Sequence, residues 1–345
     1  MKTLRLKRGK EESLDRFHPW VFSGALNEHL PEGLEEGETV GVETADGRFV
    51  GTGHYQIGSI AVRILDFSDR PIDEQFYAVR LQEAFAVRRS LGLMRPDNNA
   101  FRLVHGEGDF LPGLVVDIYG PTAVMQAHSP GMHYAREIIA GQLVAIPGLG
   151  VENVYYKSET TLPYKARLDP QNEYIIGSYV GNEALENGLK FNIDWLKGQK
   201  TGFFVDQRDN RSLLEKFAHG RRVLNMFCYT GGFSVYAMRG GAEQVHSVDS
   251  SEKAITLTDA NIALNFPGDP RHISFAEDAF KFLDRMESGA YDLVVLDPPA
   301  FAKHRSALRN ALRGYQKLNF KAMEKLAPGS ILFTFSCSQA VSREQ

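Results

Sequence analysis

Residues 223–233 read VLNMFCYTGGF, a short apolar run that passes through a glycine pair into a second apolar segment. This pattern is typical of a buried strand that turns directly into a helix. The change from strand to helix then recurs. Strands are expected at 244–248, 272–276, 291–296 and 330–335, and helices at 252–265, at 278–286 and before Leu326. This alternation predicts a Rossmann-like fold, a doubly wound and mainly parallel sheet with helices on both faces.

The sequence before residue 183 follows two other patterns. Residues 1–70 read as short strands broken by turns, with Arg48–Gly53 and Ser59–Asp66 the clearest, and predict a small β-barrel. Residues 71–182 combine a long helix, expected from Asp73 to Leu91, with short strands and a second helix, which predicts a central α+β domain. The Rossmann-like α/β domain is expected to occupy residues 183–345.

Composition excludes several classes of protein. Hydrophobic residues make up 43% and charged residues 24%, which is ordinary for a soluble globular protein. No apolar run is long enough to span a membrane, and no apolar stretch follows the basic N-terminus as it would in a signal peptide. The two cysteines, Cys228 and Cys337, form no CxxC pair, so we expect no disulfide framework, no structural zinc and a cytoplasmic location.

Charge leaves the question of a nucleic-acid partner open. The net charge of −4 is unlike that of most nucleic-acid-binding domains, which are basic. Residues 1–20, however, hold six Lys or Arg against three acids, a local charge of +3. This end is either a solvated terminus or a surface that contacts nucleic acid through residues such as Lys7 and Arg8.

The turns that follow the strands carry the candidate binding residues, because ligands of such sheets bind at the carboxyl ends of the strands. The first turn lacks the GxGxxG spacing of a dinucleotide site, which argues against a nicotinamide-dependent dehydrogenase and favours a ligand with an adenosine and no phosphate. Asp249 is placed to accept from ribose hydroxyls. Asp278 is placed to accept from an adenine amino group, with Ala279 offering a backbone amide. Either acid could instead cap a helix.

The fourth turn reads DPPAF at residues 297–301. Its two prolines fix the backbone and withhold two N–H donors, so the loop is rigid and its carbonyls can face a substrate. Four successive turns with suitable residues are a stronger signal than any one of them.

Six stretches in this order resemble a known family: HPWVFSG (18–24), LPGLVVD (111–117), TGFFVDQR (201–208), YTGGFS (229–234), DPPAF (297–301) and FSCS (335–338). Residues 181–338 resemble a class I methyltransferase. The whole chain resembles the bacterial ribosomal-RNA large-subunit cytosine-C5 methyltransferases that carry an N-terminal PUA domain. The resemblance implies S-adenosyl-L-methionine as cofactor, 23S ribosomal RNA as substrate, and a barrel that binds RNA. Class I sheets end with two further strands, so we expect this sheet to lack its last strands.

The resemblance also implies that the segment around Asp206 and Gln207 packs over the cofactor. Together with the turns, it predicts a cofactor site made of Asp206, Gln207, Phe227, Tyr229, Thr230, Gly231, Gly232, Asp249, Ser250, Asp278, Ala279, Asp297 and Pro298.

Cytosine-C5 chemistry requires a cysteine thiolate that adds to C6 and activates C5. Cys337, just past the last expected strand, is the predicted nucleophile, and its alternative role is a buried structural thiol. Asp297 is expected to hold and protonate the N3 side of the base. Cys228 is interpreted as structural. Many RNA cytosine-C5 enzymes carry a second cysteine in the fourth turn, and this chain does not, so product release must rely on Cys337 and another base, with water as one option.

The target base must leave its stack before C6 can be attacked. Phe301 and Tyr229 are close enough in sequence to stack on it, although both could be core residues. Basic side chains recur at four-residue steps along the helix after the DPPAF turn, at Arg305, Arg309, Arg313, Lys317, Lys321 and Lys325. Because this row drifts around the helix axis, only its first two or three members can share a surface. The predicted RNA-binding residues are Lys7, Arg8, Trp20, Phe301, Arg305 and Arg309.

Other functions stay open at this point. DPP turns also serve enzymes that methylate a nitrogen of an RNA base, which need no cysteine. A non-catalytic RNA-binding adaptor would need no methyl donor. The sequence predicts no metal or membrane partner, and it leaves a homodimer open.

Overall fold

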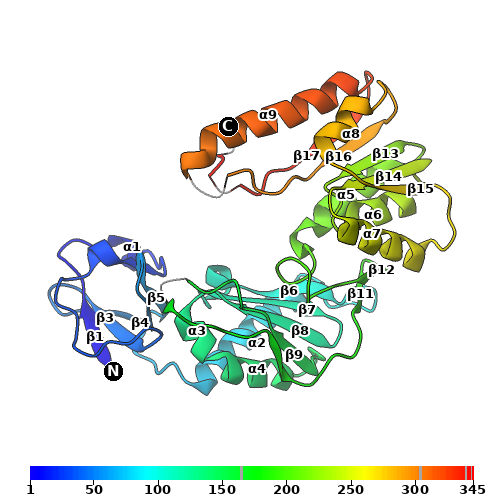
Figure 1. The fold of residues 1–345 in the computed structure, drawn as a ribbon. Coiled ribbons are helices and arrows are strands. Elements are labelled where there is room, and N and C mark those ends of the chain that lie inside the picture. The colour runs from blue at the N-terminus through cyan, green and yellow to red at the C-terminus, as the bar shows by residue number, and fades with distance from the viewer. Residues whose placement is uncertain (164–165, 303–304, 339, 343) are drawn as a thin grey trace. The chain divides into compact units, whose positions relative to one another are not determined.

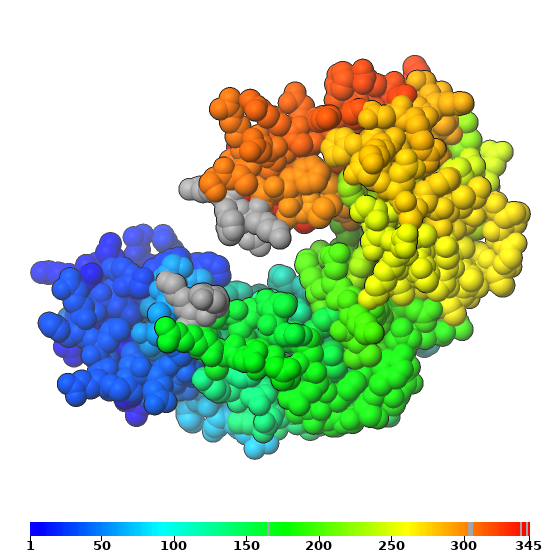
Figure 2. Space-filling model, viewed as in Figure 1, coloured from blue at the N-terminus to red at the C-terminus, as the bar shows by residue number. Residues whose placement is uncertain are grey.

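The computed structural model describes residues 1–163, 166–302, 305–338, 340–342 and 344–345. It divides into two compact units. The first contains Met1–Gly188 and Ile193–Val205, and the second contains Leu189–Asn192 and Asp206–Gln345. Figures 1 and 2 colour the chain from the blue N-terminal barrel to the red end of the second unit.

The first unit begins with a five-stranded sheet in the order β1-β3-β4-β5-β2. Its strands are β1 (Lys2–Arg5), β2 (Trp20–Phe22), β3 (Thr39–Glu43), β4 (Phe49–Tyr55) and β5 (Ile60–Asp66), and a short helix, α1 (Glu12–Asp15), lies between β1 and β2. The expected strands at 48–53 and 59–66 are confirmed as β4 and β5. Apolar residues from all five strands, including Leu4, Val21, Val42 and Val62, fill the interior.

The rest of the first unit is a second five-stranded sheet with helices. The strand order is β10-β9-β8-β7-β6. The elements are α2 (Glu74–Ser90), β6 (Ala100–His105), β7 (Leu114–Tyr119), β8 (Thr122–Ala127), α3 (Pro130–Tyr134), α4 (Arg136–Ala145), β9 (Asn153–Tyr156), β10 (Glu173–Ile176) and β11 (Glu183–Glu186). Helix α2 begins where Asp73 accepts from the Phe76 N–H at 3.0 Å, as an N-cap residue does. The α+β pattern is confirmed.

The second unit is the predicted doubly wound sheet. All its pairings are parallel, in the order β15-β14-β13-β16-β17. Its strands are β13 (Arg222–Met226), β14 (Gln244–Asp249), β15 (His272–Ala276), β16 (Leu293–Leu296) and β17 (Ile331–Thr334), and β12 (Leu189–Asn192) belongs to this unit but not to this sheet. Its helices are α5 (Arg208–Ala218), α6 (Gly232–Arg239), α7 (Glu252–Asn265), α8 (Ala279–Arg285) and α9 (Leu308–Lys325). Helices α5, α6 and α7 pack on one another, and α8 packs against α9 (Figure 1).

The strand order determines where a ligand can bind. The chain winds outward from β13 to β14 and β15, and then returns to the other side of β13 with β16 and β17. This is the switch point at which doubly wound sheets bind ligands. The turns after β13 and β16 therefore leave neighbouring strands at the same edge, and the segment after β17 lies beside the turn after β16. None of the helices in the described part of the chain has the length and apolar character that a membrane crossing requires.

Candidate active site

The turn after β13 has an unusual backbone. Phe227, Tyr229 and Gly231 have φ angles of +57°, +49° and +76°, a region that residues other than glycine seldom adopt. Helix α7 holds the turn in place: Thr258 Oγ1 donates to the Tyr229 carbonyl at 2.9 Å, and Asn261 Nδ2 donates to the Thr230 carbonyl at 2.8 Å. Because such a backbone persists only where its surroundings fix it, the turn is a rigid element of the site.

Packing against the surrounding helices also favours glycine at both positions of this turn. A Cβ atom on Gly231 would lie 2.7 Å from Thr258 Cγ2, and one on Gly232 would lie 3.0 Å from Arg211 Cδ. The contacts that the structure shows for these glycines are thus with α7 and α5. Close approach of a ligand is one reason for small residues in this turn, and helix packing is a second.

Asp249 at the end of β14 is not a helix cap. Its Oδ2 accepts from the Tyr229 N–H at 3.1 Å and its Oδ1 accepts from the Ser251 N–H at 2.9 Å. Ser251 itself caps α7 by accepting from the Ala254 N–H. Because each carboxylate oxygen can accept more than one hydrogen bond, Asp249 can still accept from a ribose. The neighbouring Ser250 is exposed.

Asp278 after β15 does cap a helix. Its Oδ1 accepts from the N–H groups of Phe280 and Lys281, both at 3.0 Å, at the start of α8. The side chain is exposed, and its Oδ2 takes no part in this cap, so capping and acceptance from an adenine amino group are compatible. Ala279 is buried. The donors and acceptors at the ends of β13, β14 and β15 therefore suit S-adenosylmethionine, which carries a ribose, an adenine and no phosphate.

The turn after β16 brings Asp297 and Gln207 together. Gln207 Nε2 donates to Asp297 Oδ2 at 3.3 Å, and Gln207 Oε1 accepts from Asn210 Nδ2 at 2.6 Å. Asn210 thereby determines which end of the Gln207 amide faces Asp297. Asp297 is half-buried, Pro298 is buried, and Asp206 is exposed. Sequence reasoning missed Asn210, although its position three residues after Gln207 is the spacing of neighbours on one helix face.

Cys337 lies beside this turn. Its side chain is exposed, and the Sγ atom is 3.8 Å from the Pro298 carbonyl oxygen. The next residue fastens the segment to the turn, because Ser338 Oγ accepts from the Ala302 N–H at 3.2 Å and is hydrogen-bonded to the Tyr315 hydroxyl at 2.7 Å. The thiol is therefore accessible and lies at the sheet edge that carries Asp297.

Cys228 has the opposite environment. It is buried, its Sγ is 3.6 Å from Thr258 Oγ1, and burial raises the pKa of its thiol to about 12. A thiol with so high a pKa is almost entirely protonated at neutral pH and is a poor nucleophile. These properties favour the structural interpretation of Cys228.

The aromatic residue Phe301 packs against helix α9, whereas the basic residue Arg309 is exposed to solvent. Phe301 packs against Tyr315, with ring centroids 4.5 Å apart, and over Gly314, where a Cβ atom would lie 2.9 Å from the ring. Tyr229 is half-buried. Arg309 is exposed and lines a groove of about 500 Å³ with Arg313. The Arg305 side chain lies outside the described residues.

The basic row of α9 diverges as predicted. Arg309 and Arg313 share the groove, whereas Lys321 forms an ion pair with Asp284 and Lys325 Nζ donates to the Met286 carbonyl at 2.7 Å. The last members of the row therefore bind the end of α8 rather than a common surface.

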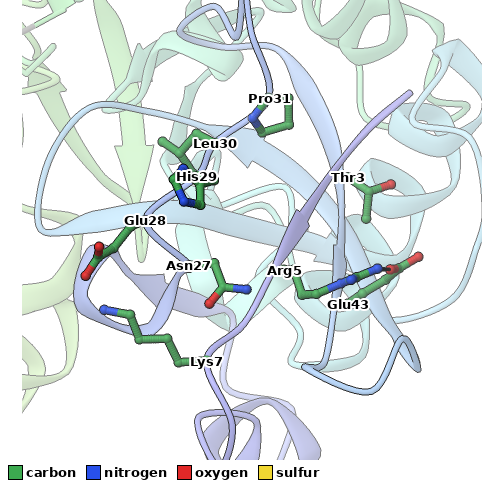
Figure 3. Close-up of a pocket in the computed structure, with 9 residues that line it drawn as sticks. All are labelled: Thr3, Arg5, Lys7, Asn27, Glu28, His29, Leu30, Pro31 and Glu43. Atoms are coloured by element: carbon green, nitrogen blue, oxygen red, sulfur yellow. Dashed lines mark hydrogen bonds and ion pairs between the residues drawn. The ribbon is translucent and has the colours of Figure 1, made fainter.

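The predicted RNA-binding residues of the barrel lie in different surroundings. Lys7 lines a pocket of about 620 Å³ with basic and acidic neighbours (Figure 3). Arg5 pairs with Glu43 at 3.4 Å, and Figure 3 shows the Lys7 side chain on the same side as the Glu28 carboxylate. Arg8 is exposed. The roles of Lys7 and Arg8 stay predictions, and the mixed charge of the pocket does not favour an anion.

The contrast between the two cysteines predicts their reactivity. Native protein is expected to react with one equivalent of a chromogenic disulfide reagent at about pH 8, because Cys337 is exposed, whereas Cys228 is buried and burial raises the pKa of its thiol. A Cys337→Ser variant is expected to react only after unfolding in denaturant. Two thiols that react at the same rate in the native protein would contradict this assignment.

Comparison with known proteins adds family matches over both units. The family described as S-adenosylmethionine-dependent methyltransferase matches residues 136–344, and the PUA-like domain family matches residues 4–67. Two relatives are each named ribosomal RNA large subunit methyltransferase I. The one from Shewanella denitrificans is 40% identical, over 97% of this chain and 85% of its own length. The one from Tolumonas auensis is 39% identical, over 99% and 87%.

Solved structures match the fold over its full length. A methyltransferase-like protein from Streptococcus mutans superposes with a TM-score of 0.82 at 22% identity, covering 100% of this chain and 88% of the other. A second structure, of a methyltransferase in complex with SAH, has a TM-score of 0.83 at 22% identity and the same coverage. At this identity the likeness concerns the fold.

Proposed function

This chain belongs to the S-adenosylmethionine-dependent methyltransferase family, and on that premise we propose that it forms 5-methylcytosine in large-subunit ribosomal RNA. The observation that carries the proposal is the exposed Cys337 thiol beside the turn that holds Asp297. A methyltransferase that acts on a nitrogen has no use for a nucleophile at this place. Carbon methylation of a cytosine needs one.

Two findings support RNA as the substrate. The relatives that share about two fifths of their residues with this chain are named as ribosomal RNA large subunit methyltransferases. Residues 4–67 match the PUA-like domain family, and the sequence resemblance gives this barrel the role of binding RNA. A protein that modifies bacterial ribosomal RNA works in the cytoplasm, and that is the location we propose.

The site residues divide the chemistry between them. Bound S-adenosylmethionine supplies an electrophilic methyl group. Asp249 accepts from its ribose hydroxyls, and Asp278 with Ala279 binds the adenine. The Cys337 thiolate adds to C6 of the flipped-out cytosine, and the electron pair of the C5–C6 double bond becomes available at C5 for methylation. Water then removes the C5 proton, the C5–C6 double bond re-forms, and the thiolate leaves.

Asp297 acts on the opposite side of the base. Its carboxyl group holds N3 and provides a proton there, so that the adduct does not carry a full negative charge, and N3 returns this proton to the carboxylate when the thiolate leaves. Gln207 donates to Oδ2 of this carboxyl group and so determines its orientation, and Asn210 orients Gln207 in turn. Asn210 is thus a positioning residue that acts through Gln207.

Product analysis tests the proposal. Purified protein is incubated with S-adenosylmethionine and unmodified large-subunit ribosomal RNA, and the RNA is digested to nucleosides for mass spectrometry. We expect methyl incorporation as 5-methylcytidine. A nucleoside methylated on a nitrogen would contradict carbon methylation, and binding of RNA without any methylation would indicate the adaptor role.

A further inference from the structure

Three buried polar atoms in the first unit lie without a hydrogen-bond partner among the described residues: Arg63 Nε, His128 Nε2 and Ser129 Oγ. Gly113, which has φ +90°, brings them together. A Cβ atom on Gly113 would lie 2.6 Å from Ser129 Oγ and 3.6 Å from Arg63 Cδ. The His128 N–H donates to the Gly113 carbonyl at 2.8 Å. Ser129 and Arg63 thus approach Gly113 where β5 of the barrel meets the loop after β8, and the His128 ring is close enough for the charge of Arg63 to lower its pKa.

The Arg63 guanidinium forms no direct ion pair among the described residues, although the charge of Glu107 acts on it from further away. Arg63 is half-buried, and its Nη1 donates to Gln56 Oε1, a neutral group. Among the described residues, no carboxylate forms an ion pair with Arg63. A guanidinium withdrawn from water without an anion is unfavourable, so this position suits an anion from outside the chain. Burial and the charges of Arg102 and Arg63 lower the pKa of His128, so that it is neutral at neutral pH and can donate from Nε2.

A row of aromatic side chains adjoins the same point. His18, Trp20 and Phe22 alternate along the chain at β2, the edge strand next to β5, so they project to one face. Their ring centroids are 5.4 Å and 6.3 Å apart in succession. His18 is exposed, and 48% of Phe22 is exposed. The row therefore offers ring surface to solvent.

Trp20 links the row to Arg63. The two residues are opposite each other in the antiparallel register of β2 and β5. The Trp20 ring is oriented by Glu107, whose Oε1 accepts from Trp20 Nε1 at 2.8 Å. An oriented indole opposite a guanidinium that forms no direct ion pair is a combination that suits one nucleotide, with the base on the ring and the phosphate on the cation.

We propose that Arg63 binds a backbone phosphate of single-stranded RNA whose base stacks on Trp20, while the covered Ser129 and His128 reach the phosphate through a water molecule. All residues of this site belong to the first unit, whereas Asp297 and Cys337, which are assigned to methyl transfer, belong to the second. The choice of RNA as the ligand rests on the proposed function. The geometry itself suits an anion joined to a planar group.

Tryptophan fluorescence tests the stacking. The chain has two tryptophans, Trp20 and Trp195, and only 1% of Trp195 is exposed. A single-stranded uridine oligonucleotide of about ten residues is therefore expected to quench the emission of Trp20 alone. The quenching should disappear in a Trp20→Phe variant. Quenching that persists in this variant, or no quenching at an RNA concentration that saturates binding, would overturn the proposal.

Two arginine variants of the full chain test the phosphate contact. Arg63→Met is expected to weaken oligonucleotide binding about tenfold, and to reduce the slope of log K against log salt by about one. Its melting temperature without RNA should stay unchanged or rise, because an unpaired charge is removed. The matched control is Arg48→Met, which removes an exposed arginine of the same barrel that pairs with Asp15 at 2.8 Å. Its RNA affinity should stay within about twofold of the original.

The result that would overturn the phosphate contact is a lower melting temperature for Arg63→Met with unchanged RNA affinity, since that is the behaviour of a structural arginine. Equal losses of affinity in both variants would mean that Arg63 acts only through the net charge of the protein. This result would also overturn the phosphate contact. The binding measurements contain no S-adenosylmethionine. RNA binding at Trp20 without formation of 5-methylcytidine would contradict the proposed function alone. Formation of 5-methylcytidine without RNA binding at Trp20 would contradict this inference alone.

Discussion

Replacement of Cys337 by alanine is expected to lower the rate of methyl transfer to ribosomal RNA by at least about 10⁴-fold. The reason is that Cys337 carries the only exposed thiol among the described residues of this sheet edge, and without the adduct C5 is not nucleophilic. The measurement is single-turnover incorporation of labelled methyl groups at saturating RNA. Binding of S-adenosylmethionine, followed by calorimetry, should be unchanged, because Cys337 is not among the residues predicted to bind the cofactor.

Cys228→Ala is the matched control for this experiment. It removes the other thiol of the chain, whose pKa of about 12 and buried position make it unreactive. The activity of this variant should stay within about tenfold of the original. Its free energy of unfolding should fall, because a buried side chain is shortened. A Cys337→Ala variant with half of its activity intact would mean that the methyl acceptor is a nitrogen.

Replacement of Asp297 by asparagine is expected to reduce the single-turnover rate by about 10²- to 10⁴-fold, the usual contribution of a positioned acid. The asparagine oxygen can still accept from Gln207 Nε2, so the change removes the ability to provide a proton while it preserves the local hydrogen bond. The effect should fall on the rate of the chemical step rather than on the affinity for RNA.

Asp292→Asn provides the control, because Asp292 precedes β16 and Asp297 follows it. Asp292 pairs with Arg222 at 2.8 Å, and this hydrogen-bonded pair lowers the pKa of its carboxyl group. Because this pKa is lowered, the pair stabilises the fold at pH values above the ordinary pKa of an aspartate. This stabilisation is lost as the pH falls through the lowered pKa of Asp292. Asp292→Asn should therefore affect stability at neutral pH and leave the rate within about tenfold. Equal rate losses in both variants would contradict a chemical role for Asp297.

The sequence predicted the second unit well because its strands are short, apolar and separated by turns with glycine, proline or aspartate. The strand ends then placed Asp249, Asp278, Asp297 and Cys337 at one edge without any knowledge of side-chain contacts. The elements that were missed include β6, β11, β12 and α5. Helix α5 begins directly after Gln207, in a segment interpreted only as packing over the cofactor. The register of β6 against β7 shifts between Arg102 and Val104, which interrupts the alternation that predicts a strand.

Contacts between distant segments were beyond prediction. The hydrogen bonds of Ser338 to Ala302 and Tyr315 fasten Cys337 to the strand-four turn, and they join three segments that no spacing relates. The same holds for Arg63, Gly113 and Ser129, which lie about fifty and sixteen residues apart in the chain and share one point in space. Patterns along a strand or helix report local geometry, whereas such clusters depend on how whole elements pack.

The central claim is that the Cys337 sulfur bonds to C6 of the target cytosine, and RNA that carries 5-fluorocytidine tests it most directly. Fluorine at C5 cannot leave as a proton does, so the adduct persists once the methyl group has been transferred. We expect a covalent protein–RNA species that survives denaturation, requires S-adenosylmethionine and maps by mass spectrometry to the peptide containing Cys337. A complete absence of this species under conditions that methylate ordinary RNA, or its attachment to Cys228, would contradict the account.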